Sequence, residues 1–101
     1  MADVDCLVSP TCPIAPTKWG ETTAVVGGKE RPLVRVYLDH TLPFDLTGQP
    51  AISVPCGFTP TGLPVGLQVV GKPWDEELVL RVADSYERET KWYEKSKALV
   101  Y

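Results

Sequence analysis

The sequence predicts an α/β fold, in which part of a mixed β-sheet packs against one long C-terminal helix. Two β-rich runs, at residues 51–54 and 65–70, are separated by ten residues rich in proline and glycine, a pattern typical of two strands joined by a turn. Because a parallel crossover needs a longer connection, we expect these strands to pair antiparallel. A third apolar run at residues 4–8, which ends at Ser9 and Pro10, predicts a buried strand that leads into a loop.

The long helix is the clearest element of the sequence, and we expect it to run from about residue 76 to residue 90. Asp75 is a suitable N-cap, and two glutamates follow in the first turn, where the helix dipole favours anions. An acid–base pair at spacing i,i+4, Asp84 with Arg88, indicates a solvated face. Five apolar side chains at spacings of three and four form the opposite face: Leu78, Val79, Val82, Ala83 and Tyr86.

The segment between the first strand and the β-rich runs has weaker signals. Prolines recur at every third position of residues 10–18, and their fixed φ predicts an extended, polyproline-like stretch. Residues 19–30 contain several glycines and no sustained period, so we expect a loop there, with a strand at residues 23–26 as the less favoured alternative. We expect a short strand at residues 33–38, which contain two valines and a tyrosine.

A short helix is expected at residues 42–47. Thr41 offers a hydroxyl as N-cap, and Pro43 falls in the first turn, where its missing N–H costs nothing. Gly48 can adopt the left-handed conformation that ends a helix.

Length, composition and charge restrict the function. The chain has 101 residues, of which 44% are hydrophobic and 23% charged, as in an ordinary globular protein of at most one domain. A net charge of -3 without a basic stripe argues against a nucleic-acid partner. The apolar runs are far shorter than the ~20 residues of a membrane helix, so no membrane partner is expected. Asp3 and Asp5 stand where a signal peptide would carry positive charge.

The cysteines and the single histidine do not predict a metal site. Cys6, Cys12 and Cys56 are an odd number without C-x-x-C spacing, and with His40 they give too few well-spaced ligands for zinc. We interpret them as reduced thiols, which indicates a cytoplasmic location, and we expect no cofactor. Cys56 and His40 would form a nucleophile and base only if the fold brought them together. A small buried cysteine and a surface histidine are the simpler interpretation.

The most distinctive pattern is PFDLTGQPAISVPCGF at residues 43–58, followed by GLPVGLQVVG at residues 62–71. Together these segments resemble the C-terminal hallmark of the amidase-signature family. Residues 5–11, DCLVSPT, resemble the strand and loop that precede this region in the same enzymes, and residues 75–87 are similar to the family's final helix. Residues 19–38 match least. The resemblance is specific for the family and not for a substrate.

The resemblance implies an amide hydrolase that acts on a small amide with a serine nucleophile, a second serine in a cis peptide and a lysine base. In the family these residues, including a Gly-Gly-Ser-Ser motif, lie in the N-terminal and central segments. The only Gly-Gly of this chain, at residues 27–28, is followed by Lys29, so no catalytic residue carries over. Asp45 stands where the family often has asparagine. We therefore expect residues 1–101 to be the C-terminal portion of an amidase-signature domain rather than a complete domain. Its partner would be the missing N-terminal part of the fold or a second copy of the chain.

Three residues are candidates for the substrate pocket. In the family, the loop after the first strand lies near the substrate, which implies that Thr11, Cys12 and Ile14 line the pocket. The alternative is that Pro10, Pro13 and Ile14 only cover the edge of the sheet.

The same segment supports a second hypothesis, a non-catalytic interaction module. The spacing of Pro10, Pro13 and Pro16, with Lys18 two residues on, is the spacing that SH3-type domains recognise. A rigid loop within a larger sheet explains this pattern equally well.

Overall fold

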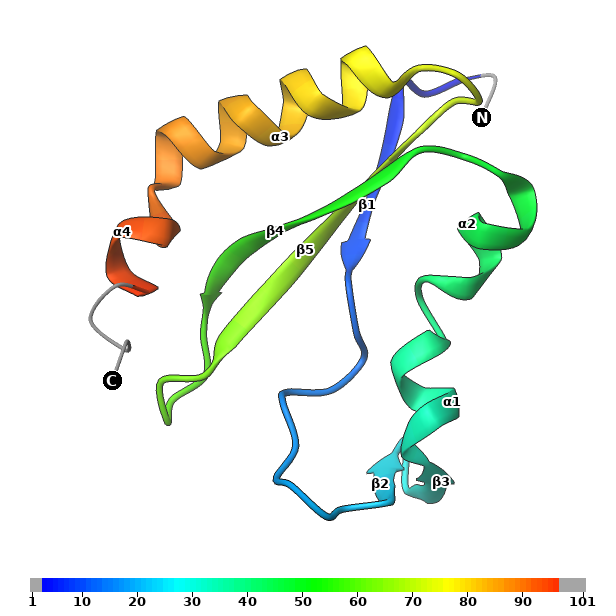
Figure 1. The fold of residues 1–101 in the computed structure, drawn as a ribbon, viewed down its shortest axis with the longest axis vertical. Helices are drawn as coiled ribbons and strands as arrows, with labels where there is room; N and C mark the ends of the chain where they lie inside the picture. The colour runs from blue at the N-terminus through cyan, green and yellow to red at the C-terminus, as the bar shows by residue number, and fades with distance from the viewer. Residues whose placement is uncertain (1–2, 97–101) are drawn as a thin grey trace.

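The computed structural model describes residues 3–96, which fold around a three-stranded antiparallel sheet with strand order β1-β5-β4 (Figure 1). Strands β2 and β3 form a separate antiparallel hairpin. This arrangement confirms the α/β class. In chain order the elements are β1 (Cys6–Pro10), β2 (Thr23–Val26), β3 (Lys29–Pro32), α1 (Leu33–Leu38), α2 (Leu42–Thr47), β4 (Ala51–Phe58), β5 (Pro64–Gly71), α3 (Glu76–Thr90) and α4 (Trp92–Ser96).

The pairing of β4 with β5 confirms the predicted antiparallel hairpin and extends it toward the turn, as far as Phe58 and Pro64. The turn is closed by Thr59, whose backbone N–H donates to the Leu63 carbonyl at 2.7 Å and whose hydroxyl accepts from the Leu63 N–H at 3.1 Å. The register shifts between Pro55 and Gly57, which leaves Cys56 as the extra residue of a bulge. Pro55 lies beside this bulge on β4, an edge strand of the described sheet, and such places tolerate a residue without an N–H.

The register places a row of polar side chains on one face of the sheet, whereas the opposite face is apolar. Ser9, Gln68 and Ser53 lie opposite one another across the three strands, and we call these residues the polar row. The neighbouring row consists of Val8, Val69 and Ile52 and faces the other side, because adjacent side chains of a strand alternate.

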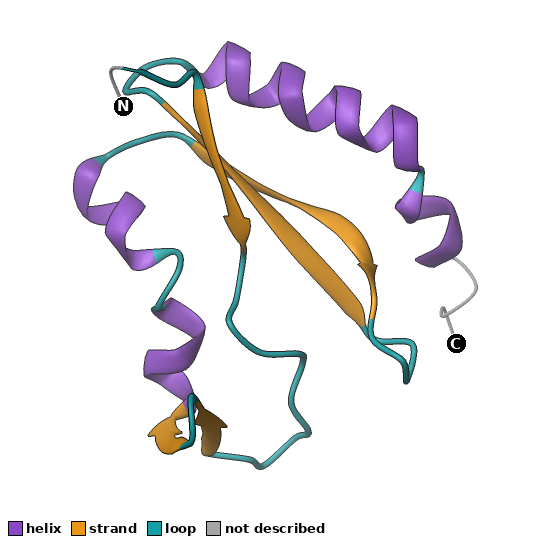
Figure 2. Cartoon of the chain, turned by 180° about the vertical axis from the view of Figure 1, so that it is seen from behind, coloured by secondary structure: helices purple, strands orange, loops and turns teal. Residues whose placement is uncertain are grey.

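Helix α3 covers the apolar face, while α1 and α2 lie on the other side of the sheet (Figures 1 and 2). The bounds of α3 confirm the helix predicted at residues 76–90, and Val79 and Ala83 of its apolar face are buried. Gly71 allows the helix to approach, because a Cβ at that position would lie 2.5 Å from Cγ2 of Val79. On the exposed face, Arg88 and Asp84 form the expected ion pair at 3.0 Å.

The short helix α2 also has the predicted bounds. Gly48 ends it in the left-handed conformation with φ of 73°, and its N–H donates to the Phe44 carbonyl at 3.0 Å. The predicted capping is wrong for both helices in one respect, since neither Thr41 nor Asp75 makes a side-chain capping hydrogen bond.

Two predictions in the middle of the chain are wrong. The expected loop at 19–30 contains β2 and the start of β3, joined by a two-residue turn in which Gly27 and Gly28 both have positive φ. The expected strand at 33–38 is helix α1, in which the buried residues Leu33 and Val36 are three positions apart. Such spacing suits a helix face, whereas a strand would bury alternate residues.

The first strand is also displaced from its predicted position. It spans Cys6–Pro10 instead of 4–8, and it is not buried, since Leu7 and Val8 are 40% and 58% exposed. Strand β1 is an edge strand of the described sheet, and an edge position tolerates Pro10. Within residues 3–96, no helix has the length and apolar character needed to cross a membrane.

Candidate functional site

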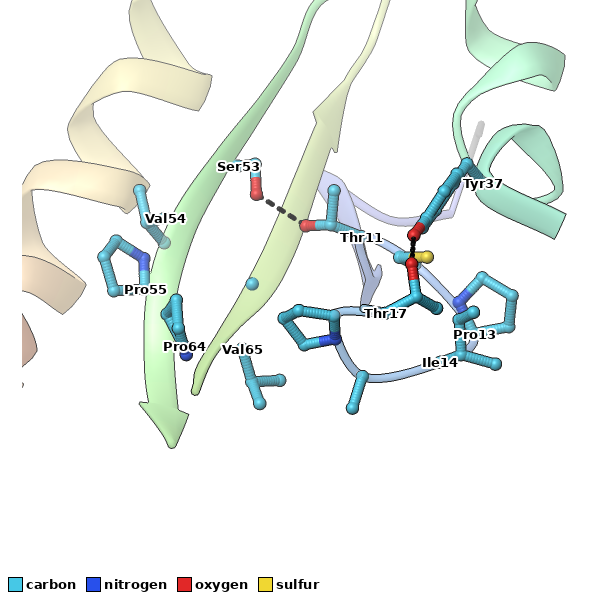
Figure 3. Close-up of a pocket in the computed structure, with 14 residues that line it drawn as sticks. Thr11, Pro13, Ile14, Thr17, Tyr37, Ser53, Val54, Pro55, Pro64 and Val65 are labelled. Atoms are coloured by element: carbon cyan, nitrogen blue, oxygen red, sulfur yellow. Dashed lines mark hydrogen bonds between the residues drawn. The ribbon is translucent and has the colours of Figure 1, made fainter. Parts of the chain in front are cut away.

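The segment that follows β1 is fixed to the sheet through Thr11. Its backbone N–H donates to the Gly66 carbonyl at 3.1 Å, and its hydroxyl lies 2.6 Å from the hydroxyl of Ser53 (Figure 3). Gly66 leaves room for this pair, because a Cβ there would lie 2.8 Å from Oγ of Ser53 and 2.9 Å from Oγ1 of Thr11. We call Thr11 and Ser53 the hydroxyl pair.

The far end of the same segment is tied to α1. The hydroxyl of Thr17 is hydrogen-bonded to the phenol of Tyr37, so residues 11–17 span the distance between the sheet and α1 (Figure 3). Helix α1 is itself held to β3 by Arg31, whose two guanidinium nitrogens donate to the carboxylate of Asp39 at 2.5 and 3.0 Å. These hydrogen bonds, together with the positive charge of Arg31, hold the pKa of Asp39 below its ordinary value.

The segment, α1 and the two hairpin strands surround a first cavity of about 740 Å³. Thr11, Cys12 and Ile14, the three residues predicted for the pocket, all line it. Prolines and aliphatic side chains form most of its wall, and no charged side chain of the described residues contributes to it. The hydroxyl pair supplies polar groups at one end (Figure 3).

A second cavity of about 310 Å³, which no sequence pattern considered above predicts, lies between α2 and the polar row. It shares the hydroxyl pair with the first cavity, but its other lining residues include Asp45, Gln68 and Thr41. Gln68 is only 3% exposed. The signal that could have drawn attention to this place is a glutamine within an otherwise apolar strand.

The only histidine is fixed next to the polar row. Its Nδ1 lies 3.0 Å from the Pro10 carbonyl oxygen, and its own carbonyl accepts a hydrogen bond from Nε2 of Gln68 at 2.8 Å. No hydrogen bond joins His40 to Cys56 in the part of the chain that the structure describes. Within residues 3–96, no three His, Cys, Asp or Glu side chains lie close enough together to hold a metal ion.

Comparison with known proteins identifies relatives along most of the chain. The family model that matches is that of the amidases, over residues 1–80. The A subunit of the glutamyl-tRNA(Gln) amidotransferase of Myxococcus xanthus is 48% identical over 97 residues, which cover 95% of this chain and 19% of the relative. The corresponding protein of Brevibacillus brevis is 47% identical over 94 residues, 91% of this chain and 18% of the relative. The chain thus spans about a fifth of the length of these curated relatives.

Two solved structures share the fold. A crystal structure of an amidase superposes with a TM-score of 0.80 at 30% identity, over 86% of this chain and 20% of that chain. A protein described in connection with a vestigial complex and the origins of an s-triazine catabolic enzyme also gives a TM-score of 0.80. It is 27% identical, over 88% of this chain and 20% of that one.

Proposed function

The chain belongs to the amidase family, and from this premise we propose that it is the C-terminal segment of an amide hydrolase. In the complete enzyme, which cleaves a C–N bond, this segment supplies part of the sheet and one wall of the substrate pocket. It supplies no catalytic residue. The nucleophilic serine, the second serine and the lysine that the resemblance implies come from the N-terminal part of the same fold, which is the principal partner of the chain.

The observation that carries this proposal is the first cavity. Its wall is apolar and uncharged, which suits the hydrocarbon part of a small amide, and pockets of this kind typically place a few polar groups where they orient the ligand. The hydroxyl pair is such a group. One of the two hydroxyls donates to the other, so one O–H remains available to donate to a carbonyl oxygen.

The names of the curated relatives, which are amidotransferase components, suggest how the reaction is used. We propose that the complete protein cleaves an amide either for hydrolysis or as one component of a transferring complex. Hydrolysis and transfer break the same C–N bond. They differ in the molecule that accepts the released group.

The alternative of an interaction module has less support. Pro10 is paired with Leu67 in the sheet, and both Pro13 and Pro16 line the first cavity. The proline segment is thus built into the fold. A pulldown of SH3-type domains with a peptide of residues 9–18 and with the folded chain compares the two hypotheses. Capture by the folded chain as efficient as capture by the peptide would favour the module.

The first test of the proposal is that the isolated chain does not hydrolyse amides, because it lacks the Gly-Gly-Ser-Ser motif that the resemblance implies for the catalytic serine. Ammonia release from a panel of primary amides, and acid release from esters, should stay at background. Turnover that disappears in Cys56→Ala or His40→Ala would overturn this expectation and restore the cysteine hypothesis.

The second test supplies the missing part. In a chimera, this chain replaces the aligned C-terminal segment of the Myxococcus xanthus relative, and amide hydrolysis is measured by ammonia release. Ile14→Trp should fill the first cavity and raise KM about tenfold or more, since one misplaced group in an apolar pocket has an effect of this order. The matched control is Val25→Trp, at a position of β2 that is 69% exposed. Equal kinetics of the two variants would refute the assignment of the pocket wall.

A further inference from the structure

We propose that the second cavity binds a small organic cation, such as a primary alkylammonium group. This inference does not depend on the proposed amide hydrolysis, because it concerns a binding event that is measured without turnover.

The charge of the cavity favours a cation. Asp45 lines it from α2, and this carboxylate makes no hydrogen bond or ion pair with any other described residue. No lysine, arginine or histidine is among the described residues that line the cavity. Asp45 is itself exposed, and with no counter-ion among the lining residues its carboxylate favours a positive ligand over a negative one.

The hydrogen-bonding capacity of the cavity also favours a donor. The amide nitrogen of Gln68 is occupied, since it donates to Oγ of Ser9 at 3.2 Å and to the His40 carbonyl at 2.8 Å. The amide oxygen of Gln68 accepts no hydrogen bond from the described residues, although this side chain is almost completely buried. The buried member of the polar row thus offers the cavity an acceptor, and an ammonium group, which has three donors and no acceptor, is its complement.

The remaining wall suits a short alkyl chain attached to the charged nitrogen. Phe44 and Ala51 line the cavity beside the polar groups, and an aromatic face attracts a cation in addition to the carboxylate. The volume of about 310 Å³ lies at the lower end for small-molecule sites. A bare metal ion fits less well, because a single carboxylate is too few ligands for a hard divalent cation.

The sequence provides direct reporters for a binding experiment. Gln49 and Gln68 are the only glutamines and there is no asparagine, so their carboxamides are the only ones among the side chains. Both residues line the second cavity. In ¹⁵N-labelled 101-residue chain, held at one protein concentration so that self-association stays constant, a titration with methylammonium chloride should shift both side-chain amide signals with saturation. Sodium acetate and acetamide, at matched ionic strength, should bind at least tenfold more weakly.

Substitution of the carboxylate tests its role. Asp45→Asn is nearly isosteric and should weaken methylammonium binding about tenfold, as expected for the loss of a charge-assisted contact. The matched control is Asp84→Asn, which removes an exposed carboxylate from α3 and should leave the titration unchanged.

Three results would overturn the proposal: shifts that stay linear without saturation, acetamide that binds as well as methylammonium, or equal loss of binding in the two aspartate variants. If the Asp45→Asn variant proved to be unfolded, the ligand series on the unmodified chain would still test the proposal. That series measures the preference for a cation without any substitution. Since no step uses catalysis, an inactive chimera would count against the proposed function and not against this site.

Discussion

Gly66→Ala is the substitution for which the structure gives the sharpest expectation. The added methyl group would lie 2.8 Å from the Ser53 hydroxyl oxygen and 2.9 Å from that of Thr11, well inside van der Waals contact. Both side chains are held in place by their mutual hydrogen bond, so at least one of them has to move. Ser53 is exposed and its hydroxyl can rotate away, so the cost is a less favourable rotamer and a lost hydrogen bond, which together give an expected destabilisation of about 1–2 kcal/mol.

The assay is urea unfolding at a fixed protein concentration, because association would make the apparent stability concentration-dependent. Ser53→Ala removes the oxygen nearest to the new methyl group. The double variant Gly66→Ala/Ser53→Ala should therefore be more stable than the sum of the single effects predicts, with a coupling of about 1 kcal/mol. Gly20→Ala is the control, because Gly20 has φ of 89° and a Cβ at that position would meet nothing within 4 Å. Its cost comes from backbone strain and should not change with Ser53→Ala. Strict additivity at Gly66 would refute the steric reasoning.

Three further predictions concern the rest of the fold. Deleting Thr59 and Pro60 together should lower the urea midpoint more than Lys72→Ala does, because the turn sets the β4–β5 register; equal midpoints would count against this role. Arg31→Gln should raise the pKa of Asp39 toward its ordinary value, as measured by NMR titration. Because the folded-state pKa of Asp39 is depressed, the stabilisation from this pair is present above the ordinary carboxyl pKa and is lost as the pH falls through the lowered value. The stability of the Arg31→Gln variant should therefore depend less on pH in the acid range. An unchanged pKa of Asp39 would contradict the assignment. The isolated chain should self-associate or bind a dye for exposed apolar surface, whereas a sharp monomer peak in light scattering, no dye binding and a cooperative melt would indicate a self-sufficient domain.

The elements that could be predicted from the sequence are those with strong local signals. Helix α3 combines an apolar stripe with acidic residues in its first turn, and α2 ends at Gly48, which has the left-handed conformation expected of it. The β4–β5 pair needs only two β-rich runs and a connection too short for any other arrangement. In each case the information lies within a single stretch of at most about twenty residues.

The elements that were missed depend on contacts made elsewhere. Residues 33–38 favour a strand by composition, but burial of Leu33 and Val36 on one side selects a helix. The residues of the β2–β3 hairpin, TAVV and KERP, do not alternate between polar and apolar types, so Gly27-Gly28 is the main sequence signal of this hairpin. In both cases tertiary context outweighed the local pattern.

The two cavities show the same limit at the level of the site. Thr11 was a candidate because of its place in the chain, whereas its partner Ser53 is 42 positions away and has the pattern of an ordinary strand residue. Their contact requires the β1–β5–β4 register and a residue without a side chain at Gly66, which no local pattern reports. Because the hydroxyl pair lines both cavities, a displacement of either hydroxyl alters the apolar first cavity and also the second cavity, which Asp45 lines. The chemistry of this region is therefore set by the sheet register and by Gly66 as much as by the side chains that face a ligand.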